Sequence, residues 1–224
     1  MDEWDFPKHG RSFSERRLVG PGETTVDGRA RLDAIVNWLQ AVAYADVIDA
    51  GLQDLVVWVV RRVKVRVERF PRLGEFVELK TACSALASRW AERRTSLPGV
   101  EAVALWVAID PKTLRPARID ALADVYGESA GDRRVRTGRS HAEPPENATS
   151  RPWPIRRADL DLAGHVNNAA YWQALEEEEL EAPLEIEVEH RAACALEPAR
   201  LVTHAADRWI VRADWTVCAS FRKR

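Results

Sequence analysis

The sequence contains few of the residues that build cross-linked or metal-bound folds. It has three cysteines, Cys83, Cys194 and Cys218, and no CxxC pair. An odd number of widely spaced cysteines argues against a disulfide framework and a structural zinc site, and it favours a reducing compartment. His190 and His204 have no metal-ligand spacing with other candidates, and no phosphate-binding glycine motif is present. We therefore expect no metal and no other cofactor.

The sequence also lacks the long apolar segments that cross membranes or direct secretion. No stretch approaches the roughly eighteen consecutive apolar residues that a transmembrane helix needs. The N-terminus, MDEWD, is acidic and does not have the apolar core of a signal peptide. We therefore expect no membrane span and a cytoplasmic location.

Neither positive nor negative charge dominates the chain. Lysine and arginine number 33 and aspartate and glutamate 35, for a net charge of −2 at pH 7. This balance creates no global field that would attract nucleic acid, so we expect no nucleic-acid partner. Arginines are nevertheless crowded in residues 61–72 and 133–157. A solvated strand face is the main interpretation, and a docking surface for an acidic partner or phosphate groups is the alternative.

The first strong pattern predicts a helix over residues 30–50. Leucine, isoleucine and valine recur there at about 3.6-residue spacing, and Trp38, Tyr44 and Ile48 add apolar groups on other faces. A helix that is apolar nearly all round is buried. Strand patterns precede and follow it, at 12–19, 55–70, 75–85, 88–97 and 100–109, and a short helix is expected at 119–126. This order predicts a sheet wrapped around a helix.

The second half of the sequence repeats this plan. A polar segment at 127–150 reads as an exposed connection. It is followed by a short strand at 153–157, a helix from Val166 to about Glu181 whose acidic run is a solvated face, and strands at 184–194, 200–206, 208–212 and 215–221. The segment WLQA at 38–41 is echoed by YWQA at 171–174. At that register Asp161 falls opposite Gly28, so only the second half carries the carboxylate.

The most informative segment is RADLDLAGHVNNAAYW, residues 157–172. It is predicted to place a carboxylate (Asp161), a turn (Gly164) and a helix start (Val166) close together. The first turn of a helix has unpaired N–H groups and a partial positive charge, which suit a developing oxyanion. A carboxylate upstream can act as a base or a nucleophile. The segment therefore predicts attack on an acyl carbonyl.

These residues also carry a resemblance to a known family. The pattern Asp-x-x-Gly-His-Val-Asn-Asn-x-x-Tyr resembles the signature of hotdog-fold thioesterases, and the longer Asp-Leu-Asp-x-x-x-His-Val-Asn-Asn-x-x-Tyr resembles acyl-ACP thioesterases of plants and bacteria. The resemblance implies an α+β fold, a tandem double hotdog in which each unit is an antiparallel sheet wrapped around one long helix. The expected units are an N-terminal hotdog (1–126), a linker (127–150) and a C-terminal hotdog with the active-site motif (151–224).

The same resemblance implies an activity and a partner. The chain would be a thioester hydrolase of fatty acid biosynthesis that releases free fatty acid from fatty acyl-ACP or acyl-CoA. Its partner would be acyl carrier protein with a 4′-phosphopantetheine-linked acyl chain, and the arginine-rich surface would receive it. Formation of a homodimer is left open by the sequence, as are the acyl chain length and the choice between ACP and CoA.

Four motif residues receive roles in the chemistry from this resemblance. Asp161 is expected to act as general base or nucleophile on the thioester. His165 either polarises the carbonyl and orients water, or is a structural histidine near the helix start. The backbone N–H groups of Gly164, His165 and Val166 are the candidates to hold the thioester oxygen.

The remaining motif residues are expected to shape the site. Asn167 and Asn168 are included with the substrate-binding residues, although their stronger interpretation is to fasten the loop or the two halves through side-chain hydrogen bonds. Tyr171 is expected in the core. Asp159 is expected to be a surface or turn residue.

Two positions depart from the plant pattern. Ala163 stands where plant enzymes have an asparagine, and Ala193 stands where they have a glutamate beside the cysteine that corresponds to Cys194. A buried cysteine is inert by default. The Asp161-x-x-Gly164 arrangement thus looks more like the Asp-centred motif of acyl-CoA hotdog enzymes. The alternative function is a non-catalytic hotdog protein that binds acyl thioesters or lipid-like ligands, and a hotdog dehydratase is a weaker third.

Overall fold

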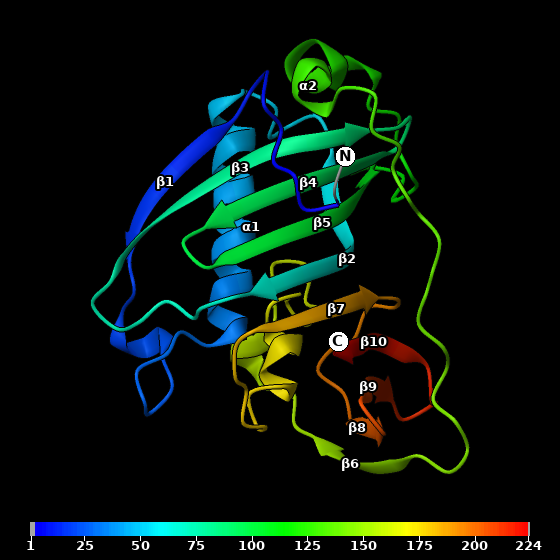
Figure 1. The fold of residues 1–224 in the computed structure, drawn as a ribbon. Helices are drawn as coiled ribbons and strands as arrows, with labels where there is room; N and C mark the ends of the chain where they lie inside the picture. The colour runs from blue at the N-terminus through cyan, green and yellow to red at the C-terminus, as the bar shows by residue number, and fades with distance from the viewer. Residues whose placement is uncertain (1–2, 224) are drawn as a thin grey trace.

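The computed structural model describes residues 3–223, so Met1, Asp2 and Arg224, at the ends of the two expected units, lie outside the described residues. Over this range one antiparallel sheet has the strand order β1-β3-β4-β5-β2-β7-β10-β9-β8-β6 (Figure 1). The strands are β1 (Phe13–Leu18), β2 (Val57–Val67), β3 (Phe76–Leu86), β4 (Trp90–Leu97), β5 (Val100–Ile109), β6 (Thr149–Trp153), β7 (Leu184–His190), β8 (Ala199–His204), β9 (Asp207–Arg212) and β10 (Val217–Lys223).

The second half of the chain repeats the strand order of the first. The first half has the order β1-β3-β4-β5-β2, and the second half, taken from the other edge, has β6-β8-β9-β10-β7. In each half the strands are therefore arranged as first, third, fourth, fifth and second. The two halves join where β2 pairs with β7, from Arg62 opposite Glu189 to Val67 opposite Leu184. The expected repeat is thus present in the strand order.

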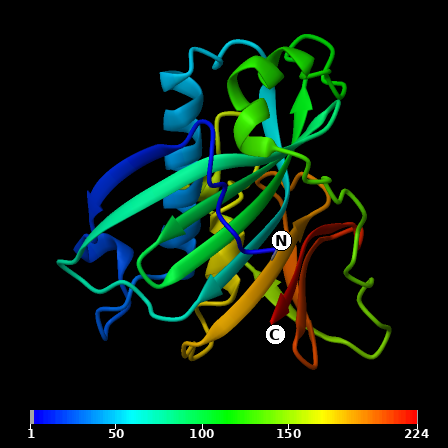
Figure 2. The same cartoon turned by 45° about the horizontal axis from the view of Figure 1, so that its top comes forward.

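Helix α1 (Leu32–Asp49) crosses one face of the sheet formed by the first half (Figures 1 and 2). Leu32, Ile35 and Trp38 are completely buried in the main core, which also contains the buried valines of β2 and β7. This confirms the buried helix predicted over 30–50. The prediction is wrong at its outer face, because Tyr44 and Ile48 are 62% and 50% exposed. The C-terminal half of α1 is therefore covered on the sheet side only.

The helix predicted from Val166 to Glu181 is not formed. This segment contains only the 3₁₀ helix η4 (Ala170–Ala174) and a series of turns, whose backbone bonds join residues three apart, such as Leu175 N–H to the Trp172 carbonyl. Two features oppose an α-helix here. Consecutive glutamates at 176–179 repel one another, and Glu176 is used elsewhere: its carboxylate accepts the Leu32 N–H at 2.5 Å at the start of α1 and pairs with Arg29 at 2.9 Å. The acidic run is therefore not a solvated helix face.

The connection between the halves is only partly exposed. The short helix expected at 119–126 is present as η2 (Asp120–Leu122) and α2 (Ala123–Ala130). The following extended segment brings buried His141 to the sheet, where its ring nitrogens lie 3.0 Å from Ser220 Oγ and 3.0 Å from Glu187 Oε1. Because side chains alternate along β7, Glu187 is on the face opposite to the core residues Ile186 and Val188. The expected exposed linker is therefore anchored to the sheet.

Among residues 3–223, no helix is both long enough and apolar enough to cross a bilayer.

Candidate active site

The segment that carries Asp161 forms a closed loop between Leu160 and Val166, which pair as an isolated bridge. Asp161 Oδ1 accepts the N–H groups of Ala163 at 2.9 Å and His165 at 3.2 Å. The Asp161 N–H donates to the His165 carbonyl at 2.8 Å, and the Asp161 carbonyl accepts the Gly164 N–H at 3.0 Å. Asp161 Oδ2 accepts no hydrogen bond from any residue that the structure describes. Within the described residues the loop thus fixes the carboxylate by one oxygen only.

Gly164 is required by the shape of this loop rather than by lack of space. Its φ is +74°, in the left-handed region that costs other residues free energy. A Cβ built on Gly164 would meet nothing within 4 Å. The carboxylate of Asp161 and the imidazole of His165, on either side of this glycine, are both exposed.

The three backbone amides expected to hold a thioester oxygen are all engaged in the protein. The Gly164 and His165 N–H groups bind to Asp161, and the Val166 N–H donates to the Cys194 carbonyl at 2.8 Å. The expectation failed because it depended on a helix starting at Val166, whose first N–H groups would have been unpaired. The imidazole of His165, in contrast to these amides, is exposed.

The two asparagines join the loop to the first half of the chain. Gln40 of α1 donates to Asn167 Oδ1 at 3.3 Å and accepts from Asn168 Nδ2 at 3.2 Å. Asn167 Oδ1 also accepts the Ala169 N–H at 2.8 Å, directly before η4. The predicted fastening role of both asparagines is confirmed. Gln40 was not identified from the sequence, although it lies in the WLQA echo.

A cavity of about 540 Å³ lies between the C-terminal half of α1 and the sheet of the first half. Most of its wall is apolar, as expected for a site that takes a lipid-like group. Leu162, directly after Asp161, is fully exposed and also lines this cavity, and Gln40 lines it as well. The wall consists of Gln40, Ala43, Tyr44, Val47, Leu52, Gln53, Val56, Val57, Trp58, Cys83, Leu86, Ala91, Arg93, Trp106, Leu122, Tyr126 and Leu162. The carboxylate loop of the second half therefore borders a cavity of the first half.

A buried charge network closes one side of the cavity. Asp46 of α1 is 1% exposed and binds the Arg93 guanidinium at 2.7 Å, Arg11 at 2.8 Å and the Tyr126 hydroxyl at 2.9 Å. Burial raises the pKa of Tyr126 to about 12, so the phenol stays neutral. Asp46 and Arg93 are 47 residues apart, and a sequence pattern contains no signal for such a pair.

The second half contains a buried aromatic group behind the loop. Tyr171, 3% exposed, stacks on Trp153 with ring centroids 5.7 Å apart and meets the edge of His190 at 5.5 Å. The prediction that Tyr171 is a core residue is confirmed. Both nitrogens of the buried His190 ring are without a hydrogen-bond partner in the described part of the chain, and burial lowers the pKa of His190 to about 3. His190 is therefore neutral. Cys194 is buried nearby as a free thiol.

Asp159 is a turn residue, as expected, but it is not at the surface. It ends η3 (Arg157–Asp159), is 5% exposed, and accepts the backbone N–H of Arg156 at 2.7 Å as well as its guanidinium. Its carboxylate is buried because it caps this turn.

One group of side chains has the composition of a metal site. His141, Glu187 and Glu189 place one ligand atom each within 4.8 Å of one another. Protein cations already approach these carboxylates, with Lys64 Nζ 3.1 Å from Glu187 and Arg191 Nη2 3.5 Å from Glu189. The group therefore reads as an internal charge cluster that holds the 127–150 segment on the sheet.

Each half of the chain matches a domain of the same protein family. The model of the acyl-ACP thioesterase N-terminal domain matches residues 10–126, and the model of the acyl-ACP thioesterase C-terminal domain matches residues 142–204. The chain belongs to the acyl-ACP thioesterase family. The motif around Asp161 and His165 thus lies in the C-terminal family domain, and the cavity lies in the N-terminal one.

Individual relatives of this thioesterase family are distant. An uncharacterised protein of Mycobacterium tuberculosis is 30% identical over 155 residues, which cover 66% of this chain and 62% of that protein. Oleoyl-acyl carrier protein thioesterase 2 of Arabidopsis thaliana is 25% identical over 196 residues, which cover 72% of this chain and 52% of that protein. The chain therefore spans little more than half the length of these relatives.

Solved structures agree with the fold. The 12:0-ACP thioesterase from Umbellularia californica has a TM-score of 0.74 at 19% identity, covering 95% of this chain and 92% of that one. An acyl-ACP thioesterase from Bacteroides thetaiotaomicron has a TM-score of 0.76 at 16% identity, covering 95% and 96%. At these identities the likeness concerns the fold alone: a large antiparallel sheet with few helices, similar to hotdog thioesterases.

Proposed function

We propose that this member of the acyl-ACP thioesterase family hydrolyses fatty acyl-ACP or acyl-CoA thioesters to free fatty acid. One observation carries the proposal: the loop that holds Asp161 borders, through Leu162, an apolar cavity of about 540 Å³. An acyl chain in that cavity would have its thioester near Leu162, which is in the same loop as the exposed Asp161 and His165 side chains. The Arabidopsis relative and the Umbellularia structure named above carry acyl-carrier-protein thioesterase names, which supports the same substrate class.

The fold proposed for this enzyme is a tandem double hotdog. The repeated strand order, first-third-fourth-fifth-second in each half, supports it. We keep the units as residues 1–126, 127–150 and 151–224. The first family domain ends at residue 126, whereas the second begins at residue 142, within the proposed linker, and ends at residue 204. The described part of the second unit contains only short 3₁₀ helices, and its motif segment is hydrogen-bonded to α1 of the first unit through Gln40. One cavity and one carboxylate would then form a single working site.

In the proposed reaction Asp161 Oδ2 takes a proton from a water molecule while the water oxygen bonds to the thioester carbonyl carbon. The C–S bond then breaks, and the thiol leaves with the proton that Asp161 held. In a second route Oδ2 itself bonds to the carbonyl carbon, displaces the thiolate, and water hydrolyses the resulting anhydride. In either route His165 donates a hydrogen bond to the carbonyl oxygen as negative charge develops on it.

The acyl carrier protein is proposed as the natural carrier, held by arginines near the linker and β2. Such an interaction between exposed charges weakens with salt. We expect the KM for acyl-ACP to rise several-fold between low and high ionic strength, while the KM for acyl-pantetheine, which lacks the protein, changes little. An unchanged KM for acyl-ACP would refute the electrostatic docking. The free thiols of Cys83, Cys194 and Cys218 support a cytoplasmic site for this reaction.

A panel of acyl-ACP and acyl-CoA thioesters of increasing chain length tests the proposal, with thiol release as the readout. Release by the wild-type chain above the rate without enzyme supports it. The second candidate function, a non-catalytic protein that binds acyl thioesters, is favoured by Ala163 and Ala193, where the plant-type asparagine and glutamate are missing. Binding of the same thioesters without any thiol release would establish that second function.

A further inference from the structure

The apolar cavity contains a hydrogen-bond donor with no acceptor. Trp106 of β5 lines the cavity, and its Nε1 atom is buried without a hydrogen-bond partner in the part of the chain that the structure describes. Buried donors are normally paired, because an unpaired one loses its hydrogen bond to water and gains none in return. Residue types alone do not require an indole here, since a phenylalanine would fill an apolar wall. The N–H of Trp106 therefore points to a ligand that accepts a hydrogen bond.

A second set of donors lies beside it. The Arg93 guanidinium binds Asp46 at 2.7 Å and Thr81 Oγ1 at 3.4 Å through Nη1, and the Tyr126 hydroxyl is also close to it. A guanidinium has more N–H groups than these three partners accept, and Arg93 lines the same cavity. Its charge is already balanced, because Arg93 and Arg11 face Asp46 and Asp49. The cavity thus offers spare donors without a net charge, which favours a neutral oxygen over an anion.

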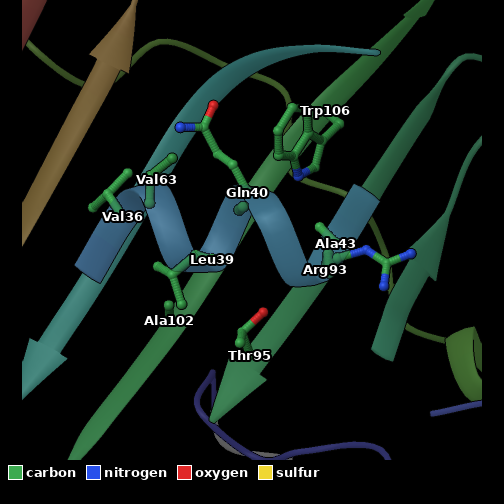
Figure 3. A pocket seen from close by; sticks show the side chains of 10 residues that line it. Val36, Leu39, Gln40, Ala43, Val63, Arg93, Thr95, Ala102 and Trp106 are labelled. Carbon is green, nitrogen blue, oxygen red and sulfur yellow. The ribbon is translucent and has the colours of Figure 1, made fainter. Parts of the chain in front are cut away.

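The strand register brings these donors together. On β4 and β5, Arg93 is opposite Ala104 and Trp106 is opposite Ala91, so Arg93 and Trp106 are diagonal neighbours on adjacent strands. Diagonal positions are about 7–8 Å apart and lie within reach of long side chains. Figure 3 shows both side chains near Ala43 of α1. A small hollow of about 10 Å³, which shares Gln40, Ala43, Arg93 and Trp106 with the cavity, has room for one water-sized group.

We infer that the cavity selects acyl chains that carry a neutral oxygen, as a hydroxyl or keto group along the chain, and that Trp106 and Arg93 donate hydrogen bonds to this oxygen. The inference rests on the proposed function in one respect: the acyl part of the thioester enters this cavity. An unsubstituted chain would leave the Trp106 N–H without an acceptor and would offer none to the spare Arg93 donors. Sites built to bind a polar group discriminate strongly against the analogue that lacks it.

The first test compares substrates with the wild-type chain. Acyl-CoA thioesters of one length, unsubstituted or with a hydroxyl or keto group at successive carbons, are compared by kcat/KM. We expect at least one oxygenated chain to exceed the unsubstituted chain by about tenfold or more. In parallel, binding of the corresponding free hydroxy acids and of the unsubstituted fatty acid is measured by calorimetry, with the same preference expected in Kd.

The second test removes one donor. Trp106→Phe keeps an aromatic ring in the wall and deletes the N–H, so the preference for the oxygenated chain should fall by about fivefold. Trp215→Phe is the matched control, because Trp215 is 58% exposed in the turn before β10, and its preference should equal that of the wild type. Arg93→Lys retains the charge beside Asp46 with fewer donors and serves as a second variant if Trp106→Phe does not fold.

The outcomes separate this inference from the proposed function. Thiol release from all chains at equal kcat/KM, with equal Kd values for the free acids, overturns the inference and leaves the hydrolase intact. Selective binding of hydroxy acids without any thiol release supports the inference and removes the hydrolase. A preference that Trp106→Phe and Arg93→Lys both leave unchanged also overturns the assignment of these donors.

Discussion

Replacement of Asp46 by asparagine tests the charge network that closes the cavity. Asp46 is 1% exposed and is the shared partner of Arg93, Arg11 and the Tyr126 hydroxyl. Asparagine keeps the shape and removes the charge, so the Arg93 guanidinium, itself nine-tenths buried, is left without a counter-charge. Removal of one partner of a buried ion pair typically costs about 3–5 kcal/mol. At about 2–4 °C per kcal/mol for a chain of this size, the melting temperature should fall by roughly 6–20 °C.

Asp49→Asn is the matched control for this prediction. Asp49 is on the same helix and also binds Arg11, but its side chain is 57% exposed. An exposed ion pair is worth about 0–1 kcal/mol, so the melting temperature should change by at most about 4 °C. Both variants are compared by thermal and denaturant unfolding. If the free energy of unfolding of Asp46→Asn is within about 1 kcal/mol of the wild-type value, the argument that Arg93 is left buried without a counter-charge is wrong.

Two further predictions concern the loop and the aromatic group behind it. Gly164→Ala should lower kcat/KM for thioesters and cost about 1–2 kcal/mol of stability, because its φ of +74° strains any side chain although nothing blocks a Cβ; a variant with unchanged melting temperature and kcat/KM would contradict this. Folding lowers the pKa of His190 from its ordinary value of 6.5 to about 3. Between pH 6.5 and pH 3 the His190 imidazole is therefore protonated in the unfolded chain and neutral in the folded one. The free energy of unfolding should therefore decrease as the pH falls from about 6.5 toward 3, and His190→Phe should flatten that part of the curve, which equal slopes for both proteins would exclude.

Local patterns in the sequence were sufficient to predict the helices and strands whose surroundings are the same along their length. The apolar pattern at 30–50 identified α1, and alternating valines identified β2. The same patterns were misleading where the two sides of an element differ. Tyr44 and Ile48 continue the apolar pattern of α1, yet they are exposed, because the segment at 166–181 covers only the other end of the helix.

The missing second helix shows how distant contacts override a local pattern. Residues 166–181 have apolar spacing that suits a helix, but Glu176 binds Arg29 and the Leu32 N–H, more than 140 residues away. A single sequence contains no trace of that competition. The same holds for Gln40 with the two asparagines, and for His141 with the sheet. The motif made Asp161 and His165 candidates, whereas the cavity and its buried donors depend on contacts between strands and helix.

Turnover of one acyl thioester by the wild type and by Asp161→Asn tests the central claim most directly. Asparagine can still accept the Ala163 and His165 N–H groups that hold the loop, so the melting temperature should be unchanged. Loss of the base should lower kcat by about 10²–10⁴-fold. His165→Ala should cost less, and Cys194→Ala should have almost no effect, because that thiol is buried whereas the Asp161 carboxylate is exposed. Equal turnover by wild type and Asp161→Asn at equal stability would contradict the account.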